Sequence, residues 1–164
     1  MKLFIPIDIT RQMYSVVYET AFKTGVTLFG EKEGENFTVA AIAGPGPRVK
    51  TQEGSHYSGN EEYARMIFND LLKDKPNLKH IGNLHVHPFK TTRLSVGELR
   101  TVKEFLKEYE EFISGVILRN HFWDFKVFPV YFSRSDPEGT EMKVQFEGRT
   151  RPRYRSGFRR KGRR

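Results

Sequence analysis

Two histidines and one glutamate stand at a spacing that could hold a metal ion. His85 and His87 are separated by one residue in a strand-like stretch, and ten residues lie between His87 and Glu98. Side chains two positions apart on a strand project from the same face, so both imidazoles point the same way. Two imidazoles and one carboxylate are the protein ligands of a catalytic zinc site that keeps one position open for water. Hydrolysis of a peptide or isopeptide bond is the chemistry that such a site favours.

Each half of this pattern also has a purely structural interpretation. A His-x-His pair on a strand, taken alone, is more often structural than metal-binding. Ser95 and Glu98 have the spacing of a capping box, in which the serine caps a helix and the glutamate occupies its third position. The metal interpretation depends on both features occurring together in one strand–loop–helix unit.

The elements that would position these residues alternate along the chain. Apolar residues at helical spacing predict three helices, over 12–22, 61–73 and 95–112. Asp8 or Thr10 is the expected cap of the first helix. Alternating and β-branched stretches predict six strands, over 25–30, 37–43, 79–87, 114–118, 124–132 and 141–146. We expect one mixed α/β domain over residues 1–148, with a mixed β-sheet flanked by helices.

Composition narrows the chemistry further. The sequence has no cysteine, which excludes a disulfide scaffold, a thiol nucleophile and every cysteine-based metal site. Any metal must therefore be held by histidine and carboxylate. No apolar run of about 18 residues is present, so we expect no membrane span. Pro6 and Asp8 come too early for a secretory signal, which favours a cytoplasmic protein.

The residues around the histidines resemble a known family. His85-Val86-His87-Pro88, followed by six residues, Ser95, two residues and Glu98, is similar to the JAMM motif His-x-His-Pro…Ser-x-x-Asp. That motif marks the MPN+ (Mov34/JAB1) metalloproteases. The resemblance covers about residues 5–132. It extends to flanking segments typical of prokaryotic, archaeal-like JAB domains. These segments are the strands at 24–30, 81–84 and 113–118, and Gly44–Pro47 with the helix at 61–73.

This resemblance implies a fold, a cofactor and a substrate class. The fold would be the cytidine-deaminase-like α/β fold of JAMM domains. Zn²⁺ would be held by His85, His87 and Glu98, and Ser95 would assist catalysis. The enzyme would be a zinc metallopeptidase of deubiquitinase type that removes a ubiquitin-like protein or a peptide tail, with a homodimer as one option for its assembly.

Two residues depart from the family pattern. Glu98 replaces the family's aspartate, and glutamate is one methylene longer but still a good zinc ligand. Lys23 stands where the family has its catalytic glutamate, and a lysine would be repelled by a zinc ion. Glu19 lies one helical turn before Lys23 on the same face and is the candidate base. The alternative is that the base is lost and the chain is a non-catalytic scaffold.

The basic charge of the chain is concentrated in residues 149–164, which contain no acidic residue. Residues 1–148 have 19 basic and 20 acidic residues, so the net charge of +8 comes from this tail. Its nine basic residues are Arg149, Arg151, Arg153, Arg155, Arg159, Arg160, Lys161, Arg163 and Arg164. Such a composition cannot bury a core and predicts disorder in the free chain. Arginines interleaved with aromatic residues suit RNA or single-stranded DNA, and an acidic protein surface is the alternative partner.

Overall fold

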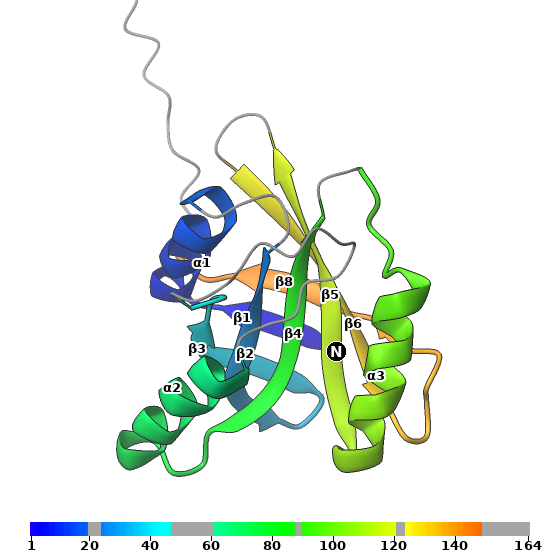
Figure 1. The fold of residues 1–164 in the computed structure, drawn as a ribbon, viewed down its shortest axis with the longest axis horizontal. Helices are drawn as coiled ribbons and strands as arrows, with labels where there is room; N and C mark the ends of the chain where they lie inside the picture. The colour runs from blue at the N-terminus through cyan, green and yellow to red at the C-terminus, as the bar shows by residue number, and fades with distance from the viewer. Residues whose placement is uncertain (20–23, 47–60, 88–89, 121–123, 149–164) are drawn as a thin grey trace, which may run out of the picture.

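Three helices and eight strands form one α/β domain in the computed structural model, which describes residues 1–19, 24–46, 61–87, 90–120 and 124–148 (Figure 1). The helices are α1 (Ile7–Glu19), α2 (Glu61–Asp74) and α3 (Val96–Glu108). The strands are β1 (Lys2–Ile5), β2 (Thr24–Glu33), β3 (Asn36–Ala43), β4 (Lys79–His87), β5 (Glu111–Asn120), β6 (Asp124–Ser133), β7 (Thr140–Glu141) and β8 (Lys143–Phe146). No helix within these residues has the length and apolar character needed to cross a membrane.

All eight strands belong to one mixed sheet that is nearly closed. Its order is β7-β6-β5-β4-β2-β3-β1-β8. β7 and β8 lie at its two ends in this order, yet only Met142 separates them along the chain. The Met142 N–H donates to the Pro129 carbonyl of β6 at 3.0 Å. One short segment therefore pairs with β6 before Met142 and with β1 after it.

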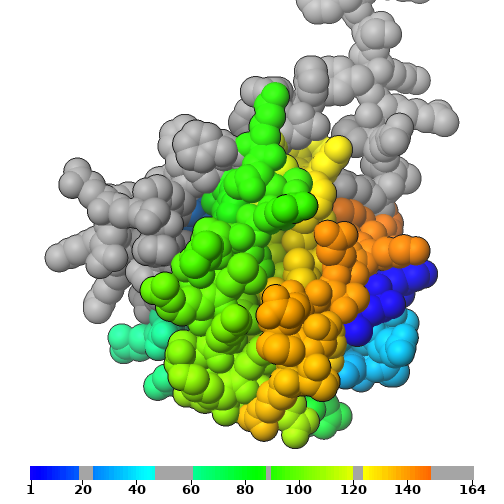
Figure 2. Space-filling view, turned by 90° about the vertical axis from the view of Figure 1, so that its right-hand side faces the viewer, coloured from blue at the N-terminus to red at the C-terminus, as the bar shows by residue number. Residues whose placement is uncertain are grey.

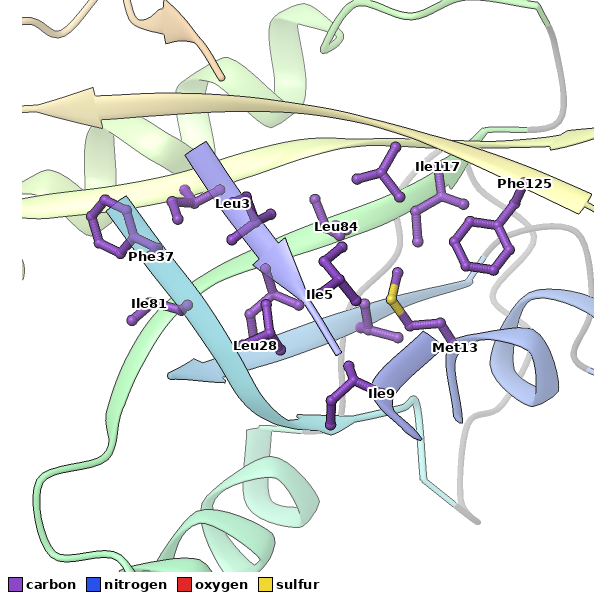
Figure 3. Packing of buried hydrophobic residues seen from close by; sticks show 14 of the residues in the cluster. Leu3, Ile5, Ile9, Met13, Leu28, Phe37, Ile81, Leu84, Ile117 and Phe125 are labelled. Carbon is purple, nitrogen blue, oxygen red and sulfur yellow. The ribbon is translucent and has the colours of Figure 1, made fainter. Parts of the chain in front are cut away.

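The inner face of this sheet carries the main hydrophobic core. Leu3 and Ile5 of β1, Leu84 of β4 and Phe125 of β6 are fully buried there. Ile9, Met13 and Val17 recur at helical spacing on α1 and belong to the same cluster. Figure 3 shows Ile9 and Met13 of α1 among the core side chains of the strands. Helix α1 thus covers the interior of the sheet.

The outer face of the sheet carries the other two helices. Val102 and Leu106 of α3 pack on Phe112 and Phe132 of β5 and β6, while Phe68 of α2 stacks on Phe29. Figure 1 shows β4 between α2 and α3, with neither helix crossing it. Figure 2 shows α3 in green beside the orange segment that contains β7 and β8.

The structure corrects several predicted boundaries. The first helix starts at Ile7 rather than at residue 12, because Pro6 accepts the first helical hydrogen bond, from the Thr10 N–H at 2.9 Å. Asp8 lies in its first turn and is not the cap. Residues 31–33, between the predicted strands at 25–30 and 37–43, continue β2, and α3 ends at Glu108 rather than at residue 112. The short strand β1 was not predicted.

Candidate metal centre

A strand–helix–strand unit positions the candidate ligands. β4 pairs parallel with β5, with His85 opposite Val116 and His87 opposite Leu118, and α3 makes the connection between the two strands. A parallel pair needs such a crossover, which brings the start of α3 back to the end of β4 where the histidines lie. On its other side β4 pairs with β2, where Gly25 is opposite His85 and leaves the outer face beside it free of a side chain.

The three predicted ligands meet in the structure. The Nε2 atom of His87 and the Oε1 atom of Glu98 are hydrogen-bonded at 2.8 Å, and His87 is the donor because a carboxylate only accepts. The Nδ1 atom of His85 lies 3.8 Å from the same Oε1 atom. The three side chains are 12–14% exposed, so they are largely shielded while solvent still reaches them.

The electrostatics of this cluster favour the ligand forms of His85 and Glu98. Burial lowers the pKa of His85, and the nearby Glu98 carboxylate offsets only part of this effect. Burial, the largest influence on Glu98, raises its pKa, but it is outweighed by hydrogen bonds from His87 and the Ser95 backbone and by the nearby imidazoles, so the pKa of Glu98 is lowered. A neutral imidazole and an ionised carboxylate are the forms that bind a metal.

The donor set fits zinc in its chemistry and nearly in its spacing. Zinc–nitrogen and zinc–oxygen bonds of about 2.1 Å in a tetrahedron place neighbouring donor atoms roughly 3.4 Å apart. The 2.8 Å and 3.8 Å separations lie on either side of that value. As they stand, no three histidine or acidic side chains of the described residues have the arrangement of a metal-bound cluster. Shifts of about half an ångström would bring the Glu98 Oε1 atom to ligand spacing from the His85 Nδ1 atom and from the His87 Nε2 atom.

Ser95 holds the glutamate in place as the cap of α3. The Ser95 Oγ atom accepts the Glu98 N–H at 3.2 Å, and the Ser95 N–H donates to Glu98 Oε2 at 2.6 Å. This is the capping box expected from the sequence. The two carboxylate oxygens therefore have different partners, with Oε2 anchored to the helix cap and Oε1 facing the histidines.

The other predicted site residues lie at or beyond the limits of the described chain. Glu19 is the last residue of α1, and its side chain, like Lys23, lies outside the described residues, as does the tail over 149–164. The chain enters β2 at Thr24, which pairs with Val86 between the two histidines. The first residue of β2 therefore lies beside the candidate centre.

One polar pair near the histidines was missed by the motif analysis. Asn83 is two residues before His85 on β4, and its side-chain Oδ1 accepts a hydrogen bond of 2.9 Å from the Ser114 hydroxyl of β5. The available signal was an asparagine within a strand, since asparagine is depleted there.

The comparisons with known proteins define a fold and leave the activity open. No family model and no curated protein matches the sequence. A solution structure of a protein from Desulfitobacterium hafniense is similar with a TM-score of 0.68 and 14% identity, covering 91% of this chain and 95% of that one. Another, of a protein from Salinibacter ruber, has a TM-score of 0.56 and 18% identity, covering 93% and 94%. The chain is thus a single-domain α/β protein with a mixed, nearly closed sheet.

Proposed function

We propose that this chain is a JAMM-type zinc metallo-isopeptidase that removes a ubiquitin-like protein or a peptide tail from its conjugate. The observation that carries the proposal is that ring nitrogens of His85 and His87 both lie close to the Glu98 Oε1 atom, at 3.8 Å and 2.8 Å. These are the residues that the motif resemblance assigns to the metal. A purely structural capping box accounts for the Ser95–Glu98 contacts and leaves unexplained why two histidines face the Glu98 carboxylate.

The proposed reaction divides the work among the residues of the chain. Bound zinc would polarise the scissile carbonyl and acidify a water molecule. His85, His87 and Glu98 would hold the ion, while the Ser95 hydroxyl retains a hydrogen that it can donate to the substrate carbonyl oxygen. Hydrolysis forms a C–O bond and breaks the C–N bond. Glu19 is proposed to take the proton from the attacking water and return it to the leaving amine.

Metal content tests the centre directly. Protein purified without chelator should hold up to one zinc per chain, and His87→Ala should abolish zinc binding measured by calorimetry after metal removal. His56→Ala, which changes a histidine outside the proposed ligand set, is the matched control and should bind zinc as the wild type does. If adding zinc to the metal-free wild type gives no heat of binding and no increase in thermal stability, the proposal is wrong.

The base is tested separately from the metal. Glu19→Gln should abolish hydrolysis of a ubiquitin-like conjugate while zinc remains bound, because the amide cannot accept the proton. Activity that survives this change would assign the base to another residue. A large gain in Lys23→Glu over the wild type would show that the natural site is catalytically degenerate.

A second candidate function follows from the distribution of charge. Nine basic residues within residues 149–164, against a nearly neutral remainder, favour a scaffold that binds nucleic acid through its tail. Engagement of half the tail on a single strand should give a slope of log K against log salt of roughly −3. Binding should be largely independent of nucleotide sequence, because phosphate contacts position without specifying. Equal affinity of a variant lacking 149–164 would exclude the tail as the binding element.

A further inference from the structure

A row of polar side chains crosses the outer face of the sheet next to the candidate centre. Thr27 of β2 pairs with Asn83 of β4, and Asn83 pairs with Ser114 of β5. Cross-strand partners place their side chains on the same face. Asn83, like His85 and His87, lies on the face of β4 opposite to the buried Leu84 and Val86. The polar row therefore crosses β4 two residues before His85 and on the same face of the strand.

The hydrogen bond from Ser114 orients the Asn83 side chain. Ser114 is 1% exposed, and its hydroxyl donates to the Asn83 Oδ1 atom at 2.9 Å. Because the oxygen of the carboxamide faces Ser114, the Nδ2 group is directed away from it, and no residue in the described part of the chain accepts a hydrogen bond from this group. The Asn83 side chain is half-buried, so these donors are within reach of a bound molecule.

The position of Asn83 matches the repeat of an extended peptide. Residues two apart on a strand are separated by about 6.6 Å, and an extended substrate has the same two-residue repeat. A substrate carbonyl held at His85 and His87 would have the carbonyl two residues away near Asn83. Asparagine is unfavourable in the middle of a strand, so a binding role accounts for a residue that strand formation does not favour.

We propose that Asn83 is a substrate-binding residue and that Ser114 is its positioning residue. The Asn83 Nδ2–H group donates to a backbone carbonyl of an extended peptide segment that lies along the outer face of β4, two residues from the scissile bond. This inference rests on the proposed function, since it takes the metal centre as the place where the bond is cleaved. It identifies the substrate as an extended peptide segment recognised through its backbone.

Two hydroxamates of different length test the inference on the zinc-loaded protein. Acetyl-triglycine hydroxamate reaches from the centre to Asn83, whereas acetohydroxamate contacts the centre alone. Asn83→Ala should weaken the longer compound by about threefold to tenfold, the usual effect of one lost hydrogen bond, and leave the shorter one unchanged. Asn83→Asp keeps the acceptor for Ser114 but has no donor, so it should lose at least as much. Ser114→Ala should give a smaller loss.

The outcomes separate this inference from the proposal beneath it. Zinc affinity should be the same in the wild type and all three variants. If Asn83→Ala and Asn83→Asp bind both hydroxamates as the wild type does, Asn83 is not a substrate-binding residue, although the centre stands. If both compounds weaken equally, Asn83 acts on the centre itself and the inference is wrong. A wild type that takes up no zinc, or takes it up and binds neither compound, overturns the proposed function and this inference with it.

Discussion

Glu98 serves the helix and the candidate centre with different oxygen atoms. Its Oε2 atom accepts the Ser95 N–H at the start of α3, and its Oε1 atom contacts His87 and faces His85. A carboxylate at the N-terminus of a helix is also stabilised by the helix dipole. Its placement in the centre is therefore fixed by the same bonds that begin the helix.

Two substitutions separate these tasks. Glu98→Gln removes the charged ligand and should lower zinc affinity by at least tenfold, whereas Ser95→Ala leaves the carboxylate in place and should bind zinc nearly as the wild type does. Ser95→Ala should instead lower the free energy of unfolding by about 0.5–2 kcal/mol, the usual effect of losing an N-cap. Zinc calorimetry and urea unfolding of the metal-free proteins measure the two effects. Equal loss of zinc affinity in both variants would contradict the division.

His80 illustrates a partly buried histidine in a structural environment. It lies among the rings of Phe29, Phe105, Tyr109 and Phe112, with its Nδ1 atom 3.3 Å from the Tyr109 hydroxyl. Burial lowers the pKa of His80 from its ordinary value of 6.5, and the Gly82 backbone offsets only part of this shift. The folded protein therefore holds His80 in its neutral form.

This lowered pKa predicts a stability change in weak acid. The unfolded chain binds a proton at His80 near pH 6.5 and the folded chain binds it only at lower pH, so stability is complete above pH 6.5 and falls as the pH drops below it. His85, whose pKa is also lowered, contributes in the same window. His80→Phe should therefore reduce the pH dependence without abolishing it. Urea unfolding at pH 7.5 and pH 5.5 checks this, and an unchanged difference would contradict it.

At the scale of elements, the candidate centre depends on how closely β4 and β5 approach. A Cβ atom added at Gly82 would lie 2.0 Å from the Ile113 carbonyl oxygen, so only glycine fits there. A bulge next to it leaves Ile81 without a partner in β2, since Leu28 pairs with Gly82 and Phe29 with His80. Ile81 then joins the inner core and His80 turns to the outer face.

Gly82→Ala should disturb this contact. We expect a loss of about 1–3 kcal/mol in the free energy of unfolding, the usual effect of forcing an extra group into a packed interior. Gly34→Asn is the control, because Gly34 has a positive φ of 60° and open space around it, and asparagine tolerates that conformation. Unfolding by urea compares the two variants, and an equal or smaller loss in Gly82→Ala would be the contrary result.

The elements differ in how far the sequence could predict them. α2 and β4 were predicted within a residue or two because their apolar periodicity is long and clearly bounded. β1 has only four residues before Pro6, too few for a periodic signal, and it is held by pairing with the distant β3 and β8. The candidate metal ligands could be proposed from the sequence because they fall within one 14-residue segment. Asn83 and Ser114 are brought together by the pairing of β4 with β5. The spacing of residues along the sequence does not reveal which residues pair between strands.

At the scale of the whole molecule, Met142 joins the two ends of the sheet. Its side chain is 7% exposed and belongs to the main core, and the strands on either side of it pair with β6 and β1. Met142→Ala should therefore cost about 2–5 kcal/mol of unfolding free energy, whereas Met142→Leu, which nearly conserves volume, should cost less than about 1.5 kcal/mol. Thermal unfolding measures both. Equal and small losses would mean that the closure contributes little.

The same closure determines how this protein meets other chains in a crowded solution. An open sheet offers rows of unpaired N–H and C=O groups on which a foreign strand can add, and such edges seed aggregation. Here the strands at the two ends of the sheet order have two and four residues, and Glu141 and Lys143 place opposite charges on them. β8 pairs with all four residues of β1, and β7 pairs with Val130 and Tyr131 of β6, so these stretches of strand edge are used within the molecule. At these positions the way the sheet ends protects the domain against strand-by-strand self-association.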